Sequence, residues 1–396
     1  MPDKIGKIWQ NKIFIPFVLC IIITGISSQS ILSGGKKFEP GGKEYTHYNN
    51  FKIFKASYFH LIEKKDLYQL HPDDHYDLYK YSPAFALLMA PLAYLPDFLG
   101  LTLWNLLNGL LLLFAIRRLP FVTEKNRVWM AGFIFIELIT ALQNSQSNAL
   151  IAGLLLMAFL FLEKKQIALA SLCIVFTVFI KLFGLVALAI FIFYPDKLKS
   201  AFYTLGWTLL LAALPLLVIS PSQLSFLYQS WLDMLTNDHQ ASTGLSVAGW
   251  LDSWFRMNLS KNILLLGGAV VLCIPLLKYK FYRDLQFRLF FMSSLLVWMV
   301  IFNHKAESPT FIIAVTGIAV WYFSQKKKMI NTALLILAFI FTILSPNDLF
   351  PKTIRDTYVI PYVLKAVPCI LIWLKITCDL LVFGIKKPAL NEPAYH

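Results

Sequence analysis

Long apolar runs, separated by short polar segments, follow one another along almost the whole chain. A helix that crosses the hydrocarbon core of a membrane needs about 20 mostly apolar residues, and several of these runs are shorter. We therefore expect an all-α polytopic membrane protein of about 12 spans, some of them part-depth or packed inside the helix bundle. The apolar runs are Ile13–Ile31, Leu99–Ile116, Val128–Leu142, Ala149–Leu162, Ile167–Ile180, Leu182–Tyr194, Ala201–Ile219, Ile263–Leu277, Leu289–Phe302, Thr310–Phe323, Thr332–Leu344 and Val359–Phe383.

Composition agrees with this class of protein. Of the 396 residues, 58% are hydrophobic and only 15% are charged, which excludes an ordinary soluble globule. The first apolar run lacks a small-residue cleavage site, so we read it as a retained helix. We expect a single membrane domain over residues 1–396, with a first outer loop at 33–82 and a second at 220–262.

The distribution of basic residues predicts the orientation. The net charge is +14, and Lys and Arg gather at the ends of apolar runs, as the positive-inside rule requires. They fall on one side only if both termini are cytoplasmic and residues 84–95, which contain Pro91, dip into or lie along the outer side without crossing. The basic clusters are Lys4/Lys7/Lys12, Arg117/Arg118/Lys125/Arg127, Lys164/Lys165, Lys197/Lys199, Lys278/Lys280/Arg283/Arg288, Lys326–Lys328 and Lys386/Lys387.

The first outer loop carries an unusual concentration of carboxylates and imidazoles: Asp66, His71, Asp73, Asp74, His75 and Asp77. Before them, an apolar stripe that includes Phe51 and Phe54, with Lys52 and His60 opposite, predicts an amphipathic helix in the headgroup plane. We expect Asn49 and Asn50 at its N-cap. We also expect a second short helix near Pro72, with Asp73 and Asp74 in its first turn.

Five segments, in order, resemble the GT87 (DUF2029) family of integral membrane glycosyltransferases, which have the GT-C fold. The first is similar to the family's "YPP-F-LL-P-LP" segment, the second to an "NGQ-N" turn, the third to a "K-P" motif and the fourth to an "NQS" loop. The fifth stands where the family has a histidine-bearing outer loop. The resemblance covers roughly residues 48 to 308. In this sequence the segments are Tyr79–Pro96 followed by Leu103–Asn105, Asn144–Asn148, Lys181–Gly184, Gln240–Ser246 and Asn303–Lys305.

The resemblance implies transfer of a sugar, a hexose or pentose and first of all a mannose-like one, from a polyprenyl-phosphate donor. The acceptor would be a glycan or lipid on the extracytoplasmic face of the cell membrane. The implied reaction is a single inverting displacement, with an acidic residue of the first outer loop as base. The chain departs from the family pattern at three places: Asn49–Asn50 replace an expected acid, Ser145 replaces Gly and Gly184 replaces Pro.

Two carboxylates are candidates for the base, because the acceptor hydroxyl must lose a proton during transfer. Asp77, six residues before Pro83, is the first choice; the alternative is that it is a solvated loop acid. Asp66 is the second, with a helix-end turn as the alternative. Asp73 and Asp74 fit helix-start charges better.

The remaining candidates concern the donor and the sugar. Lys181, His304 and Lys305 are expected to bind the donor phosphate, although Lys181 could instead snorkel at a helix end. Glu137, inside an apolar run, is expected to be a structural partner for a buried donor. The candidates for sugar or acceptor contact are Asn50, Tyr81, Asn144, Gln146, Asn148 and Gln240.

The sequence predicts no metal centre and no cofactor. The five cysteines, all inside apolar runs, have no metal-ligand spacing. Two other classes stay open: a transporter or flippase of lipid-linked saccharide, and a catalytically silent relative with the GT-C fold. The concentration of polar loops on one face favours an enzyme over a transporter, because transporters commonly show repeat symmetry.

Overall fold

The computed structural model describes residues 14–239, 243–257, 259–347 and 350–384, and these residues are mostly helical. The α-helices are α2 (Phe14–Leu32), α3 (Asn49–Ile62), α4 (Pro83–Leu88), α5 (Ala90–Ala93), α6 (Asp97–Arg117), α7 (Glu124–Gln143), α8 (Asn148–Glu163), α9 (Ile167–Ile180), α10 (Lys197–Ala213), α11 (Pro221–His239), α12 (Val247–Phe255), α13 (Lys261–Cys273), α14 (Leu285–Ile301), α15 (Phe311–Phe323), α16 (Met329–Leu337), α17 (Lys352–Ile354) and α18 (Val367–Leu381).

Short non-α elements connect these helices. A two-stranded antiparallel hairpin, β1 (Gly35–Lys37) with β2 (Glu44–Thr46), pairs Lys36 with Tyr45 at its centre. The 3₁₀ segments are η1 (Leu182–Phe193), η2 (Leu214–Leu217), η3 (Ile274–Leu277), η4 (Tyr279–Phe281) and η5 (Ser308–Thr310), and the π segments are η6 (Ala338–Leu344) and η7 (Arg355–Val359).

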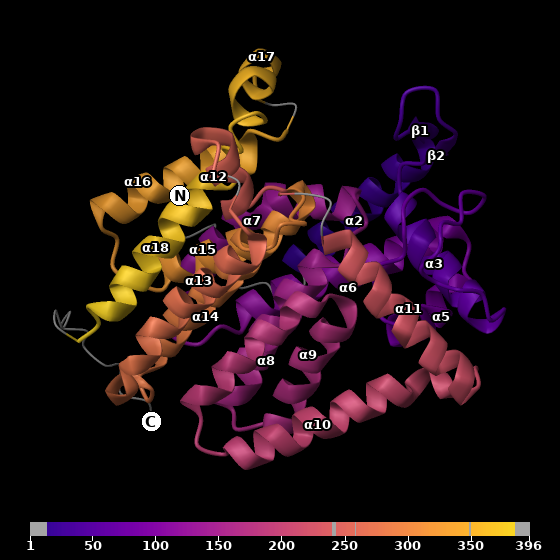
Figure 1. Ribbon diagram of the computed structural model, residues 1–396. Helices are drawn as coiled ribbons and strands as arrows, with labels where there is room; N and C mark the ends of the chain where they lie inside the picture. Colours follow the sequence, from indigo (N-terminus) through magenta and orange to yellow (C-terminus); the bar gives the residue numbers. More distant parts are fainter. Residues whose placement is uncertain (1–13, 240–242, 258, 348–349, 385–396) are drawn as a thin grey trace.

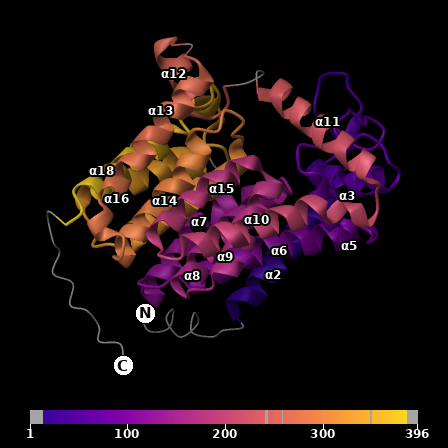
Figure 2. The ribbon, with the colours of Figure 1, turned by 60° about the horizontal axis from the view of Figure 1, so that its bottom comes forward.

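The bundle is built from neighbours in the sequence and closed by a few long-range pairs. Helix α8 packs against both α6 and α9, α2 packs against α6, and α15 packs against α14 and α7. In Figure 1 the hairpin and α3 lie at one side of the molecule, α14 to α18 at the other, and α8 and α9 between them. The view in Figure 2 keeps this order and shows α11 extending beside α3. Helices α8 and α9 therefore separate the part that contains α3 from the part that contains α14 to α18.

Three helical stretches are long and apolar enough to cross a membrane: Ile15–Leu32, Asp97–Arg117 and Lys197–Leu217. The last is covered least by protein, with Leu198 88%, Phe202 73% and Leu209 61% exposed. A continuous exposed apolar surface on such a helix is suited to contact lipid. Further apolar helices are shorter. The all-α, membrane-spanning class agrees with the sequence analysis, while the number of crossings and their orientation stay predictions.

The segment at residues 84–95 does not form one crossing helix. It contains two short helices, α4 of six residues and α5 of four. At about 1.5 Å per residue neither approaches the ~30 Å needed to span a bilayer core. The Ser82 hydroxyl caps α4 and Pro83 occupies its first position, so the chain turns sharply here. This agrees with the expectation that the segment stays on one side.

Two expectations for the flanking segments were wrong. The run Val359–Phe383 is not one helix, because residues 360–366 form turns and α18 begins only at Val367. Helix α3 exists, but it begins at Asn49, and its N-cap is Tyr48 without a side-chain cap bond. Asn49 cannot cap, because its amide is already paired with the backbone of Tyr76, through Nδ2 to the carbonyl oxygen at 2.7 Å and through Oδ1 from the amide nitrogen at 2.9 Å.

The environment of α3 and of the loop after it also differs from the expectation. The apolar stripe of α3 is covered by protein and not by headgroups, since Phe51, Phe54 and Leu61 are fully buried and α3 packs on α4 and α5. His60, expected on the polar face, is buried as well. No helix begins near Pro72, where residues 72–74 form a turn whose Pro72 carbonyl accepts hydrogen bonds from side chains of the hairpin segment.

A buried ion pair connects α7 to the segment before α18. Lys365 Nζ lies 2.8 Å from Glu137 Oε1 and donates to Ser308 Oγ at 2.7 Å, and both charged side chains are almost wholly buried. The expectation that Glu137 is a structural partner for a buried donor is confirmed. Because an isolated charge in an apolar core is far more costly than a pair, each residue depends on the other.

We predict that Glu137→Gln or Lys365→Met alone lowers the free energy of unfolding by about 3–5 kcal/mol, because each leaves an uncompensated charge or polar group in the core. The double variant Glu137→Gln/Lys365→Met should recover most of that loss. Thermal unfolding midpoints of the purified protein in lipid nanodiscs, followed by tryptophan fluorescence, measure both effects. Additive losses in the double variant would contradict the pairing.

Candidate active site

The loops that carry the resemblance segments meet in space. Asn50 Nδ2 on α3 donates to the Asn144 carbonyl at 2.9 Å, which ties the first outer loop to the α7–α8 turn. The Leu245 amide donates to the Ala306 carbonyl at 3.1 Å, which ties the loop before α12 to the loop after α14. Segments far apart in the sequence therefore form one polar surface at the ends of several helices.

A continuous hydrogen-bonded chain runs through this surface from a cation to a carboxylate. Lys181 Nζ donates to Asn148 Oδ1 at 2.8 Å, and Asn148 Nδ2 donates to Gln146 Oε1 at 2.5 Å. Gln146 Nε2 then donates to Glu307 Oε2 at 2.8 Å. Asn148 and Gln146 are buried, whereas Glu307 is exposed. We call these four residues the Lys181–Glu307 chain. All its dipoles point the same way, so each bond strengthens the next.

Lys181 occupies the position between α9 and η1, where the backbone is extended and the helix stops. Burial lowers the pKa of its ammonium group to about 8, against the opposing effect of the Glu307 carboxylate, and Lys80 lowers it further. Its Nζ lies 5.9 Å from the centre of the Tyr81 ring. The ammonium is thus a cation whose proton is lost as the pH rises through about 8.

Asp77 lies at the edge of the same surface. Its carboxylate is exposed, and Oδ2 is 3.2 Å from Lys80 Nζ, while Oδ1 accepts from the Leu78 amide at 2.7 Å. Its backbone has a φ of +74°, an uncommon conformation for a non-glycine residue. The negative charges of Asp77 and Glu307 both add to the effect of burial, which raises the pKa of Tyr81. Asp77 therefore acts electrostatically on Tyr81, and its ion-pair partner Lys80 acts on Lys181.

The Asp66 carboxylate, by contrast, accepts hydrogen bonds from several neighbouring residues. Ser230 Oγ on α11 donates to both carboxylate oxygens at 2.9 Å, and the Tyr68 amide donates to Oδ1 at 3.0 Å. Gln69 Nε2 adds a fourth bond at 3.3 Å. A carboxylate with these donors holds a turn against α11, which fits the helix-end alternative. A catalytic role for Asp66 stays a prediction that these contacts do not favour.

The other predicted residues are spread over the same loops. Asn144 is exposed, and its Nδ2 donates to the Thr140 carbonyl at 2.8 Å at the end of α7. His304 and Lys305 are partly buried in the loop that also contains Glu307. A side chain at Gly244, with φ +55°, would collide with the His304 carbonyl, so these two loops are closely packed. Gln240 lies outside the described residues.

Comparison with known protein families decides the broad class. The sequence matches glycosyltransferase family 87 over residues 79–346. The chain belongs to glycosyltransferase family 87. No curated protein matches it. All five resemblance segments lie inside the match, which begins at the first residue of Tyr79–Pro96, whereas Asp66 and Asp77 precede it.

Sequence reasoning did not single out two residues of this arrangement: Glu307, which ends the Lys181–Glu307 chain, and Lys80, whose Nζ lies 3.2 Å from the Asp77 carboxylate. The spacing of Lys80 three residues after Asp77 was a usable signal. The contact between Glu307 and Gln146 joins residues 161 apart, and no local pattern predicts it.

The structure explains both departures from the family pattern within the matched span. Ser145, where the family has Gly, has a φ of +53°, a conformation that glycine adopts without strain. Gly184, where the family has Pro, donates its amide to the Lys181 carbonyl at 3.0 Å, and any Cβ there would collide with Thr177. Proline has no amide hydrogen, so it could not donate to the Lys181 carbonyl. Gly184 donates this hydrogen bond and leaves room for the Thr177 side chain.

We predict that Ser145→Gly raises the free energy of unfolding by about 1 kcal/mol, because glycine relieves the left-handed backbone. The change also removes a buried Ser145 hydroxyl that has no hydrogen-bond partner among the described residues. The matched control is Ser147→Gly, two residues later, whose buried hydroxyl also has no hydrogen-bond partner among the described residues but whose φ is −84°, so glycine relieves no backbone strain there and should not raise the midpoint. Thermal unfolding of the wild type, Ser145→Gly and Ser147→Gly in nanodiscs measures these effects. A midpoint for Ser145→Gly below that of the wild type would contradict the explanation.

Proposed function

We propose that this family 87 protein transfers a sugar from a polyprenyl-phosphate donor to a glycan or lipid acceptor on the extracytoplasmic face of the membrane. The observation that supports this best is the Lys181–Glu307 chain, which fixes a cation at the end of apolar helices. The nearby charge of Lys80, which pairs with the exposed carboxylate of Asp77, acts on that cation. A lipid-linked phosphate needs that combination, since its tail belongs among apolar helices and its head needs a cation. The sugar we expect first is a mannose-like hexose.

The cation is suited to the leaving phosphate. Lysine presents a compact positive charge to phosphate, and the negative charge that develops on the leaving oxygen is greatest in the transition state. Lys80, which acts electrostatically on Lys181, adds a second positive charge at the same place. His304 and Lys305 lie on the loop that the Glu307 contact joins to Lys181, and we assign them to the donor head group.

The absence of a nucleotide-binding unit in the described part of the chain supports this donor class. Its only sheet there is the hairpin β1–β2, and phosphate loops of nucleotide-binding folds connect a strand of a parallel sheet to a helix. Within residues 14–239, 243–257, 259–347 and 350–384, a nucleotide sugar therefore has no such site. A lipid-linked monophosphate needs none.

Asp77 is the base in this proposal. The acceptor oxygen attacks the anomeric carbon, the bond from that carbon to the phosphate oxygen breaks, and the hydroxyl proton passes to the Asp77 carboxylate. The phosphate leaves with its charge held by Lys181, and the single displacement inverts the anomeric configuration. Asp77 is exposed and keeps free acceptor capacity beyond its two hydrogen bonds, unlike Asp66. Asp77 lies just before the matched span, four residues before Tyr81 in the sequence, and its charge acts on Tyr81.

A transporter of lipid-linked saccharide is the alternative that uses the same cation. It would bind the donor phosphate at Lys181 without needing a base, so only a measurement of chemistry separates the two. Membership of a glycosyltransferase family favours the enzyme.

The donor test uses purified protein in nanodiscs with a panel of synthetic polyprenyl-phosphate sugars, the matching nucleotide sugars and simple glycoside or glycolipid acceptors. We expect product only from a polyprenyl-phosphate sugar, detected by mass spectrometry. Lys181→Ala should raise the KM for that donor strongly, and Lys181→Arg should restore it only in part, since guanidinium geometry differs from ammonium geometry.

The pH dependence provides an internal control for the same donor test. Because the ammonium of Lys181 loses its proton near pH 8, the KM for the donor in the wild-type protein should rise above that pH. The Lys181→Arg variant stays charged and should lack this rise. Robust transfer from a nucleotide sugar alone would defeat the proposal, and donor binding with no product from any acceptor would favour the transporter.

The base test compares two aspartates. We predict that Asp77→Asn lowers kcat by about 10²–10⁴-fold with unchanged expression and thermal stability, because the amide keeps the shape but cannot accept the proton. Asp66→Asn should instead lower the thermal midpoint, because its amide NH₂ would face the Ser230 and Tyr68 donors, and should leave most activity. An active Asp77→Asn with an inactive but stable Asp66→Asn would reverse the assignment.

A further inference from the structure

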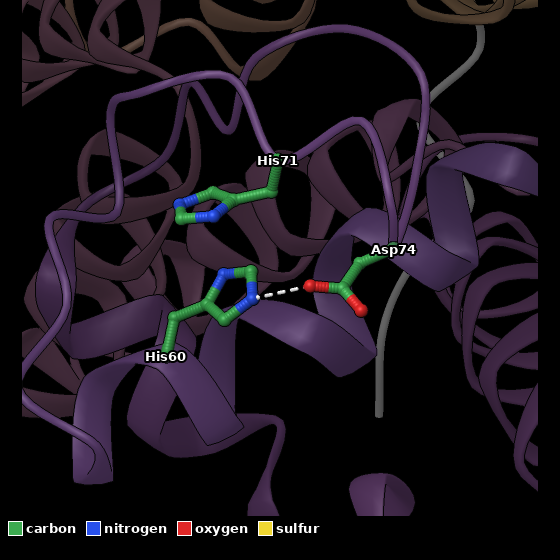
Figure 3. Close-up of side chains that lie close together, drawn as sticks. All are labelled: His60, His71 and Asp74. Carbon is green, nitrogen blue, oxygen red and sulfur yellow. Dashed lines mark hydrogen bonds and ion pairs between the residues drawn. The ribbon is translucent and has the colours of Figure 1, made fainter.

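Two imidazoles and a carboxylate meet between the end of α3 and the loop that follows it. His60 Nε2 lies 2.9 Å from Asp74 Oδ2, and the His60 and His71 rings are 3.9 Å apart between centroids. One possible ligand atom from each of these three residues lies within 4.8 Å of the others. Figure 3 shows the two rings facing each other, with the Asp74 carboxylate beside them and joined to His60 by a hydrogen bond.

The hydrogen bonds around the cluster prepare His71 to act as a ligand. His71 Nε2 lies 2.9 Å from the Asp66 carbonyl oxygen, and a carbonyl can only accept, so Nε2 carries the proton. The lone pair of the neutral ring is then on Nδ1. Histidines that bind metals almost always donate their other ring nitrogen to a carbonyl or carboxylate in this way.

The burial of the cluster agrees with a binding site that is preformed by packing. His60 is only 3% exposed, so one ligand is fixed by packing on α3, while the Asp74 side chain reaches solvent and leaves a path for an ion. A third imidazole, that of His75, lies 6.1 Å from His60 and 6.0 Å from His71 between centroids. Its Nδ1 donates to the Asp77 carbonyl at 3.0 Å, which links the cluster to the proposed base.

We propose that His60, His71 and Asp74 bind a divalent transition metal ion of the zinc type, which clamps the loop over residues 66–77 to α3. Two imidazole nitrogens and one carboxylate oxygen form a donor set that suits Zn²⁺ and disfavours Mg²⁺ and Ca²⁺. Bonds of about 2.0–2.2 Å in tetrahedral geometry separate ligand atoms by roughly 3.3–3.5 Å. The His60–Asp74 pair, at 2.9 Å, would therefore open by about 0.5 Å, and any pair as far apart as 4.8 Å would close by about 1.5 Å. Water fills the fourth position.

The clamp has a defined consequence for the proposed base. Asn49 holds the Tyr76 backbone from one side and His75 holds the Asp77 carbonyl from the other, so an ion at this cluster completes the support of the segment that presents Asp77. This consequence rests on the proposed function. The metal site itself does not, because it is measured without any sugar transfer. The proposed metal site differs from the sequence-based expectation of no metal centre. His60 is separated from the other two ligands by more than ten residues, so no local ligand spacing in the sequence indicates the site.

The binding test uses protein prepared without a polyhistidine tag and stripped with a chelator. Co²⁺ is the spectroscopic probe, and Zn²⁺ is then titrated in competition. We expect one Co²⁺ per chain with the intense visible bands of tetrahedral nitrogen and oxygen coordination, displaced by Zn²⁺. Zn²⁺ should also raise the thermal midpoint, because an ion that binds the folded state stabilises it. Amide hydrogen exchange over residues 71–77 should slow when Zn²⁺ is added.

The variants separate the site from general surface binding. His71→Ala and Asp74→Ala should each weaken Zn²⁺ by at least about tenfold and abolish the Co²⁺ bands. Both residues reach the surface, so these variants should fold. The controls are Asp73→Ala, the neighbouring carboxylate that instead pairs with Lys43, and the exposed His47→Ala; both should bind as the wild type does. No binding by the wild type, or equal binding by His71→Ala and His47→Ala, would overturn the proposal and leave a simple His–Asp hydrogen bond.

Discussion

The architecture of the site depends on one constraint: the ammonium of Lys181 lies between two apolar helical segments and must be compensated there. The compensation comes through Asn148 and Gln146 from the carboxylate of Glu307, so one cation fixes the relative positions of the α7–α8 turn, the end of α9 and the loop before α15. Asn148 and Gln146, which are buried, would each be a costly polar group without these partners. Together they form a rigid polar surface, which is what a transferase needs to hold a charged leaving group.

Sequence reasoning succeeded where the physics was local. Apolar runs and proline positions could be read directly, and they predicted the helical membrane class and the two short helices around Pro91. It failed where one partner was distant. Asn49 was predicted to be an N-cap because capping depends on residues close in the sequence. Its side-chain amide instead donates to the carbonyl oxygen of Tyr76, 27 residues away. Glu307 and His60 were undervalued for the same reason.

The first outer loop and the matched span make different contributions. The matched span supplies the Lys181–Glu307 chain, whereas Asp77 comes from the loop just before it. That loop is held by contacts that include Asn49 with Tyr76, Lys43 with Pro72 and Asp66 with Ser230. In the proposed function, the matched span would hold the donor phosphate and the loop before it would supply the base.

The Glu137–Lys365 pair has a consequence for how the protein is made. The two residues are separated by 228 positions, and ribosomes add roughly 5–20 residues per second. Helix α7 is therefore synthesised about 10–45 s before its cation exists. During that interval the nascent bundle contains an acidic side chain without its partner, and α7 cannot reach its final packing. Completion of the C-terminal segment is then the event that locks the bundle, so a ribosome that stops early leaves a product open to membrane quality control.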